Sequence, residues 1–350
     1  MTKPSPVSDR LGRFLGVLRL SLTARCNLAC PYCCPESIEP PGLLSVEDQI
    51  RLIDAACQLG IQTLRLTGGE PLLTDRVWPL LDALSLGRKA HDHPFSRLNE
   101  IAITTNGSLL NDEKARRLRA AGVDRITISL DAVSGGSIAR MAGLPSGAEA
   151  GNALLDRVLA GIDAARAAGF NPAQGRLKLN AVIQRGCNDD QLIPLARLAR
   201  QQGLQLRLIE YMDVGNRNGW CRDQVMPANE MVALLHSHWP LQNQGRSPGE
   251  TSRQWIYQDG VGSVATIASI TEPFCSDCNR LRITADGQAF TCLFASEGVD
   301  LRPWLGENVS GLELQNAMAQ LWTRRSDRFS EERGLKQAGH HHAEMAYLGG

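Results

Sequence analysis

Six of the ten cysteines in this 350-residue sequence fall into two compact groups. The first has the spacing C-x3-C-x2-C and the second C-x2-C-x13-C; their members are Cys26, Cys30, Cys33, Cys275, Cys278 and Cys292. Three thiolates are one fewer than the four that close a four-iron cluster, so each set leaves one iron free to bind another molecule. Each group therefore predicts a [4Fe-4S] cluster with an open iron. Zinc is an alternative at both groups, and a closed first site with Cys34 as fourth ligand is another.

The overall composition narrows the class of protein. The formal net charge is zero and 43% of the residues are hydrophobic, which predicts one large or two medium globular domains. No strong attraction to nucleic acid or to a membrane surface follows from zero net charge, so we expect neither as a partner. We find no apolar run long enough to span a bilayer and no secretory signal, and we expect a cytoplasmic location.

Short apolar strands alternate with helical patterns through the first 212 residues. The expected strands are residues 17–23, 63–67, 101–105, 125–130, 176–183 and 204–212. The expected helices are residues 45–60, 111–121, 150–168 and 189–202. This alternation predicts an α/β protein with a parallel sheet and helices outside it, as either an open doubly wound sheet or a partial barrel.

The pattern changes after about residue 213, where polar, glycine-rich stretches at 215–220 and 242–250 read as loops. We expect strands at 253–257 and 263–268, a hairpin turning at Asp286-Gly287, and a helix near 310–323. The sequence thus predicts a first domain at 1–215 and a second at 216–350 that carries the second cysteine group.

Several strands that should be buried carry a cation: Arg19, Arg65, Lys178 and Arg207. A buried charge is costly unless it is paired. Salt bridges with Glu70, Asp131 or Glu210 are one explanation, and an anionic substrate such as a nucleoside triphosphate is another.

The second cysteine group has arginines beside it. Because side chains alternate along a strand, Cys278, Arg280 and Arg282 should share one face. Arginine binds phosphate oxygens with a forked geometry, so this face suits an anionic ligand. The alternative is a solvated hairpin face.

The first cysteine group, with the aromatic Tyr32 before its last cysteine, resembles the signature of the radical S-adenosylmethionine (SAM) superfamily. The stretch TGGEP at 67–71 ends the second strand, where that superfamily holds the methionine end of SAM. The resemblance implies a partial (β/α)6 barrel related to the TIM barrel, with a C-terminal α+β region. It also implies that SAM lies against Tyr32, Gly69, Ser129 and Met212.

Motifs along nearly the whole chain resemble the GTP 3',8-cyclase family, including LKLNAVIQRGCND at 177–189 and FCSDCNRLRITADG at 274–287. By matching position, the resemblance implies that GTP contacts Arg19, Arg65, Thr104, Lys178, Arg280, Leu281 and Arg282. The family's Gly-Gly end reaches the active site, which implies the same for Gly349 and Gly350. One residue too many between ITTNG and ISLDA leaves Thr105 as an alternative to Thr104, and Cys34 stands where relatives keep methionine.

This family is a lyase of molybdenum cofactor biosynthesis. The resemblance implies two [4Fe-4S] clusters, SAM, GTP and an electron donor. A 5'-deoxyadenosyl radical would take the ribose 3'-hydrogen, and the C3' radical would attack guanine C8, giving (8S)-3',8-cyclo-7,8-dihydroguanosine 5'-triphosphate. Cyclic pyranopterin monophosphate synthase would act next, and a homodimer is compatible with the sequence. The rivals are a peptide-modifying radical enzyme and a non-enzymatic iron-sulfur or zinc protein that binds nucleic acid.

Overall fold

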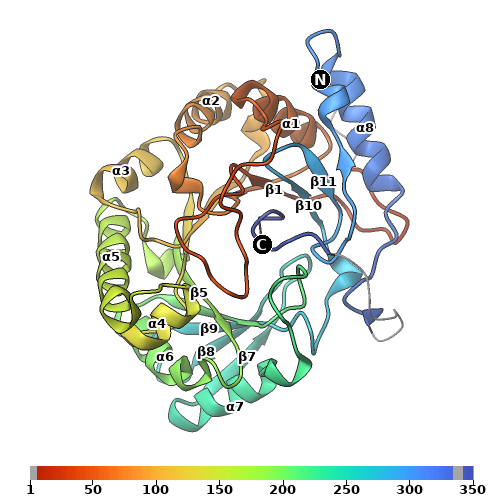
Figure 1. Ribbon diagram of the computed structural model, residues 1–350. Coiled ribbons are helices and arrows are strands. Elements are labelled where there is room, and N and C mark those ends of the chain that lie inside the picture. Colours follow the sequence, from red (N-terminus) through yellow and green to blue (C-terminus); the bar gives the residue numbers. More distant parts are fainter. Residues whose placement is uncertain (1–5, 334–341, 350) are drawn as a thin grey trace.

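The computed structural model describes residues 6–333 and 342–349, and these form a curled sheet surrounded by helices (Figure 1). The strand order in the sheet is β12-β11-β10-β1-β2-β3-β4-β5-β6-β9-β8-β7. The six parallel strands at its centre are β1 (Val17–Ser21), β2 (Thr63–Thr67), β3 (Glu100–Thr105), β4 (Arg125–Ser129), β5 (Leu177–Ile183) and β6 (Gln205–Glu210). The prediction of an α/β partial barrel is confirmed, and of the two arrangements left open the curled one is correct.

Helices follow most of these strands and cover the outside of the sheet (Figure 1). They are α1 (Val46–Gln58), α2 (Val77–Lys89), α3 (Asp112–Ala120), α4 (Gly135–Met141), α5 (Gly147–Ala167), α6 (Leu192–Gln201), α7 (Ala228–His238) and α8 (Gly311–Thr323). The first begins at Ser45, which forms a capping box with Asp48. In the described part of the chain, no helix has the length and apolarity that crossing a membrane requires.

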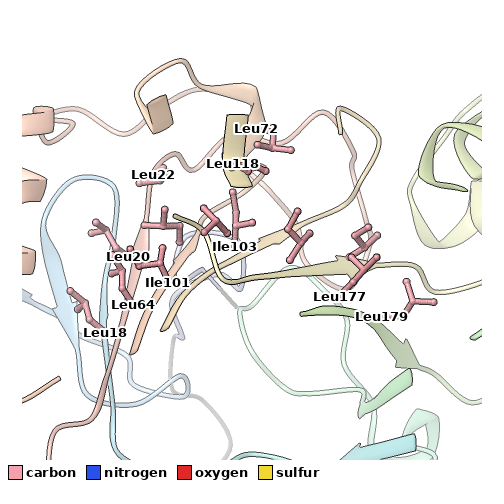
Figure 2. Packing of buried hydrophobic residues seen from close by; sticks show 14 of the residues in the cluster. Leu18, Leu20, Leu22, Leu64, Leu72, Ile101, Ile103, Leu118, Leu177 and Leu179 are labelled. Carbon is pink, nitrogen blue, oxygen red and sulfur yellow. The ribbon is translucent and has the colours of Figure 1, made fainter. Parts of the chain in front are cut away.

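The alternation of side chains along the strands separates the core from the interior of the barrel. Leu18 and Leu20 of β1 and Leu64 of β2 are fully buried and pack toward the helices, with Ile101, Ile103, Leu177 and Leu179 (Figure 2). The residues between them, such as Arg19 and Arg65, therefore face the interior. The apolar half of each strand stabilises the fold, and the other half is left for polar side chains.

Strands from the C-terminal part extend the sheet at both edges. At one edge lie β10 (Arg280–Ile283), β11 (Gln288–Phe290) and β12 (Val299–Asp300), with β10 parallel to β1. At the other lie β9 (Ser263–Ile267), β8 (Arg253–Tyr257) and β7 (Leu241–Gly245), with β9 parallel to β6. The second cysteine group is thereby brought beside the first strand. A domain division at residue 215 stays a prediction.

Two parts of the chain differ from expectation. Residues 242–250 were expected to be a loop, but Leu241–Gly245 forms the edge strand β7, whose polar side chains are exposed and therefore lack the apolar signal of a strand. Helices α2, α4 and α7 were not predicted. The first is interrupted in its pattern by Pro79 near its start, and α4 is only seven residues long.

Candidate functional site

The first cysteine group lies in the loop that follows β1, at the carboxyl ends of the barrel strands. The Cys33 N–H donates to the Cys30 carbonyl at 3.0 Å, which closes a tight turn between these two residues. The Leu28 N–H lies 3.4 Å from Cys26 Sγ, and Asn106 Nδ2, from the loop after β3, lies 3.6 Å from the same sulfur. Cys26 thus already has donors that would stabilise a thiolate.

The electrostatics of this group fit a cationic centre. Burial, followed by the charges of Cys33 and Asp131, raises the pKa of Cys30 well above its ordinary value, and burial also raises the pKa of Cys26 and Cys33. A bound metal centre would supply the positive charge that three close thiolates need. Among the described residues, no group of three histidine, cysteine or acidic side chains is placed to hold a single metal ion. A cluster makes no such demand, because each cysteine binds a different iron.

The TGGEP turn packs directly on the cysteine loop. A Cβ on Gly69 would lie 2.0 Å from the Arg25 carbonyl oxygen, so only glycine fits there. Gly68 has φ +135°, which also favours glycine. The Gly69 N–H donates to Thr23 O at 2.8 Å. This turn and the cysteine loop therefore form one backbone surface.

Glu70 ties this surface to β3. Its buried carboxylate accepts hydrogen bonds from Thr105 Oγ1 at 2.7 Å and from the N–H groups of Asn106 and Leu72 at 2.7 and 3.0 Å. Thr105 is thus a structural partner of Glu70, whereas Thr104 lines a cavity inside the barrel. Of the two threonines left open by the sequence, Thr104 has the position suited to a ligand.

A small pocket beside the first group contains two of the expected SAM residues. Tyr32 and Ser129 line it together with Asp131. Tyr32 donates its hydroxyl proton to Asp131 Oδ2 at 2.7 Å, and Asp131 Oδ1 accepts the Val182 N–H at 2.8 Å. Burial raises the pKa of Asp131 to about 6. Met212 lies elsewhere, in the wall of the cavity inside the barrel.

The second cysteine group forms part of the wall of this cavity in the barrel, which we call the central cavity. Its lining includes Arg19, Arg65, Thr104, Arg280, Arg282, Cys275, Cys278 and Cys292. Arginines determine the charge here. Burial raises the pKa of most thiols, but Arg280 and then Arg325 outweigh it at Cys278 and lower its pKa to about 7. At Cys292 burial prevails and raises the pKa to about 12.

Three arginines stand side by side across neighbouring strands in the barrel interior. In register, Arg19 of β1 pairs with Arg282 of β10 on one side and with Arg65 of β2 on the other. Like charges in directly opposed positions are destabilising. Burial, then Arg282 and Arg65, lower the pKa of Arg19 well below its ordinary value. Arg65 Nε and one terminal nitrogen of Arg282 are buried without a hydrogen-bond partner. The positive charge of this row is of the sign that would suit an anion.

Further cations continue this row along the barrel wall. Arg207 and Arg125 line the central cavity, and Arg207 Nε donates to Asn180 Oδ1 at 2.8 Å. Lys178 is not among the residues that line the central cavity. Burial and the charges of Arg207 and Arg125 lower the pKa of its side chain to about 8. Arg125 and Asn180 were missed from the sequence. Arg125 begins a strand whose other residues are apolar or small, and that signal could have identified it.

The three acids considered as salt-bridge partners of the strand cations have other partners in the structure. Glu210 accepts the N–H groups of Ala228, Ile270 and Thr271 at 2.8 to 3.0 Å. Glu70 and Asp131 likewise accept backbone N–H groups. These three carboxylates are therefore engaged in holding loops at the strand ends. Leu281 lies on the opposite face of β10, fully buried in the core, so a ligand would meet only its backbone.

The last described residues enter the barrel interior (Figure 1). The Gly349 carbonyl accepts from Arg19 Nε and Thr67 Oγ1, both at 3.1 Å. Gly349 has φ +64°, and a Cβ there would lie 2.6 Å from Ser21 Oγ. Tyr347 donates to Asp286 Oδ2 at 2.9 Å. This tail was expected at the site only from the resemblance; Gly350 lies outside the described residues.

Comparison with known proteins agrees with this geometry. Residues 20–199 match the model of the radical SAM superfamily, and residues 204–331 match that of Molybdenum Cofactor Synthesis C. The chain is 63% identical over 351 residues to the GTP 3',8-cyclase of Synechococcus sp. strain CC9902, with 100% of both chains covered. It is 43% identical to the GTP 3',8-cyclase of Acidothermus cellulolyticus, covering 99% of each chain.

Solved structures show the same fold at low identity. Streptococcus suis SuiB, crystallised with S-adenosylmethionine, matches 93% of this chain and 70% of its own with a TM-score of 0.59 and 15% identity. The enzyme anSMEcpe with bound AdoMet and a peptide matches 95% of this chain and 94% of its own, with a TM-score of 0.52 and 13% identity. At such identities the likeness concerns the fold alone.

Proposed function

The chain belongs to the GTP 3',8-cyclase family of the radical SAM superfamily, and from this premise we propose how its own residues serve the reaction. Its function is that of a GTP 3',8-cyclase, a lyase of molybdenum cofactor biosynthesis. Its cofactors are [4Fe-4S] clusters and SAM. The distribution of thiols, charges and close backbone surfaces in the barrel supports an assignment of each partner to particular residues.

The two cysteine groups hold one cluster each. Cys26, Cys30 and Cys33 bind the first, and Cys275, Cys278 and Cys292 bind the second. The placement of the first group in one loop after β1, with hydrogen-bond donors at Cys26, and the arginine-rich setting of the second group are the observations that support this donor set. When bound, the first cluster and SAM would supply the radical chemistry at the ribose, and the second cluster would supply a binding position for the guanine.

SAM lies between the first cysteine group and the carboxyl ends of the strands. The backbone at Gly69 comes close enough to bind its methionine end, because no side chain intervenes there. Tyr32 and Ser129 line the adjoining small pocket, and Met212 closes the side toward the central cavity. The acids Glu70 and Asp131 favour a cationic cofactor in this half of the barrel.

GTP lies in the central cavity, and the row formed by Arg282, Arg19 and Arg65 is the observation that carries this assignment. A triphosphate would complement the positive charge of three adjacent buried guanidiniums. Arg280, Lys178 and Thr104 extend the contact, together with the backbone of Leu281. Because the cavity also borders the second cysteine group, the base can reach that group while the phosphates reach the arginines.

The chain also shields the reaction from water. Met345 and Leu348 of the tail pack with Val214, Phe290 and Phe294, of which Phe294 lines the cavity, and Cys33 and Cys292 of the two groups pack against this cluster. Gly349 then binds Arg19 from within. Excluding water protects a reactive radical from side reactions and strengthens the charges that hold the substrate. We assign this tail, including Gly350, to the active site.

One assay tests the substrate assignment. After anaerobic reconstitution, the protein should contain iron and sulfide for two clusters. With a reductant, SAM and GTP, it should form 5'-deoxyadenosine together with a cyclised guanosine triphosphate. Equal turnover with ATP would refute the assignment of GTP, and iron for a single cluster would refute the second site. Formation of 5'-deoxyadenosine with a peptide in place of GTP would favour the peptide-modifying alternative.

The chemistry also defines the partners. A one-electron donor must reduce the first cluster, and an enzyme that rearranges the cyclised nucleotide, cyclic pyranopterin monophosphate synthase, consumes the product. We place these encounters in the cytoplasm, where reduced thiols persist. A matching test is co-incubation with that synthase, which should convert the cyclised triphosphate to the cyclic monophosphate with release of pyrophosphate.

A further inference from the structure

Four charged side chains, three of them buried and one half-buried, lie behind the second cysteine group, on the side away from the substrate. They are Asp9 and Arg13, which precede β1, and Arg325 and Asp327, which follow α8. Their side chains are 0%, 2%, 1% and 13% exposed. Burying charges costs free energy unless they are well paired. The pairing of these four side chains therefore determines whether this contact between distant parts of the chain is stable.

The four charges form one alternating network, which we call the buried quartet. Arg13 Nε lies 2.5 Å from Asp9 Oδ2, and an Arg325 terminal nitrogen lies 3.6 Å from the same oxygen. Arg325 Nε lies 3.1 Å from Asp327 Oδ1. Asp9 Oδ1 accepts the Leu11 and Arg13 N–H groups at 2.9 Å. Each guanidinium is thus held between carboxylates and keeps further N–H groups for other partners.

Those further N–H groups bind the cysteine turn. Arg13 donates to the Cys275 carbonyl at 2.8 Å, and Arg325 donates to the Cys278 carbonyl at 2.6 Å. The Thr291 hydroxyl, next to Cys292, donates to Asp327 at 2.6 Å. The quartet therefore contacts every member of the second cysteine group, either directly or through its neighbour in sequence.

Arg325 itself is held rigidly. Its guanidinium lies 4.6 Å from the ring centroid of Trp322, and Trp322 Nε1 donates to the Arg13 carbonyl at 2.9 Å. The Arg10 N–H donates to the Arg325 carbonyl at 3.1 Å. A guanidinium fixed from three directions can act on its neighbours with little loss of entropy.

Arg325 approaches Cys278 from the opposite side to Arg280. Arg280 lines the central cavity, whereas Arg325 lines a separate surface groove behind it. Arg325 donates to the Cys278 carbonyl from this side, whereas the Arg280 side chain lies on the cavity side of β10. Only Arg280 is placed to respond to the substrate. Arg325 acts on the cysteine whether or not substrate is bound.

We propose that Arg325 is a positioning residue that fixes the Cys275–Cys278 turn and raises the reduction potential of the second cluster by donating hydrogen bonds around Cys278. This inference rests on the proposed function, which places a cluster at these cysteines. Positive charge and hydrogen bonds near a cluster's sulfurs favour its reduced form. The buried quartet holds that charge in place, and Asp327 limits its strength.

The test compares Arg325→Gln with the neighbouring Arg324→Gln, whose side chain is exposed and serves as the matched control. Full-length proteins are reconstituted anaerobically without GTP, and iron, sulfide and the potential of each cluster are measured by a redox titration followed by electron paramagnetic resonance. In R325Q we expect two clusters, with the reduced-to-oxidised ratio of the second about tenfold lower at a fixed potential, or about 59 mV for one electron. R324Q and the first cluster should be unchanged.

A second variant keeps the proposal testable if R325Q does not retain its second cluster. Asp327→Asn leaves Arg325 in place with less of its charge neutralised, so the potential of the second cluster should move in the positive direction. An unchanged potential in R325Q at full iron content, or in D327N when R325Q loses iron, would overturn the inference. Iron for one cluster in the unmodified protein would instead contradict the proposed function.

Discussion

The two cysteine groups have the same number of thiols but opposite electrostatic surroundings. Acidic side chains lie near the first group, where Asp131 and Cys33 add to burial in raising the pKa of Cys30. Arginines surround the second, where they bring the pKa of Cys278 to about 7 despite burial. The first setting favours a cationic ligand such as SAM, and the second favours an anionic ligand such as GTP. Equal cysteine counts therefore correspond to different tasks.

Removing one cysteine from each group in turn should give the largest measurable difference between the two groups. Cys30→Ala should lose about half of the roughly eight irons and all SAM cleavage. Cys292→Ala should lose a similar amount of iron but still form 5'-deoxyadenosine, without the cyclised nucleotide. Iron analysis and chromatography of the products check both. Cys34→Ala is the matched control and should keep two clusters; loss of SAM cleavage in Cys292→Ala would contradict the division of tasks.

The arginine row should be the next most sensitive feature. Arg282→Ala removes a buried guanidinium that has an unpartnered nitrogen, so kcat/KM for GTP should fall about 100-fold, as expected for losing one or two charged hydrogen bonds. SAM cleavage without product should continue. The control variant Arg253→Ala, at a residue of β8 that pairs with Glu272 away from the central cavity, should match the unmodified protein. A fall in SAM cleavage equal to the fall in cyclisation would show that the row does not serve GTP alone.

The pH dependence of GTP binding should identify Lys178. Its pKa is lowered to about 8 by burial and by Arg207 and Arg125, so the side chain is cationic below that pH and becomes neutral above it. KM for GTP should therefore rise up to about tenfold between pH 7 and pH 9. Lys178→Arg should flatten this rise, because arginine stays charged. An unaltered profile in that variant would exclude Lys178 as the titrating group.

The smallest effect should come from Glu250, in the loop between β7 and β8. Its neighbour Thr251 lines the central cavity, and the Gly249 carbonyl accepts from Arg280 at 3.2 Å. Its charge acts on Arg65 and Lys178, so it competes with a bound triphosphate. Because Glu250 is exposed, Glu250→Gln should lower KM for GTP only about twofold to threefold. Glu113→Gln, on the outer helix α3, is the control; a raised KM in E250Q would contradict this role.

Much of the barrel could be predicted because its strands are apolar and short. The expected strand at 63–67 is reproduced, and the one at 176–183 begins one residue later, at Leu177. The turn at Asp286-Gly287 was also correctly predicted. Gly287 has φ +89°, a conformation that favours glycine, and the strands on either side pair antiparallel. These are local signals, which a single sequence carries well.

The contacts that make the site selective are not local. Arg19 and Arg282 are neighbours only because β10 pairs with β1, and Arg13 reaches Asp327 across almost the whole chain. The periodicity of a sequence does not indicate which residues far apart in the chain will be in contact. Exposed edge strand β7 was missed for a different reason, since its polar side chains need no apolar face. Charged residues in strands that are expected to be buried, such as Arg125 at the start of β4, were the best sequence signal of the site.

The most direct test of the account follows a single hydrogen atom. The reconstituted protein is incubated anaerobically with a reductant, SAM and GTP carrying deuterium at C3', and the products are analysed by mass spectrometry. If the first cysteine group generates the radical and the arginine row holds GTP within its reach, deuterium should appear in 5'-deoxyadenosine and be absent from the cyclised nucleotide. Unlabelled 5'-deoxyadenosine beside a product that retains its deuterium would contradict the account.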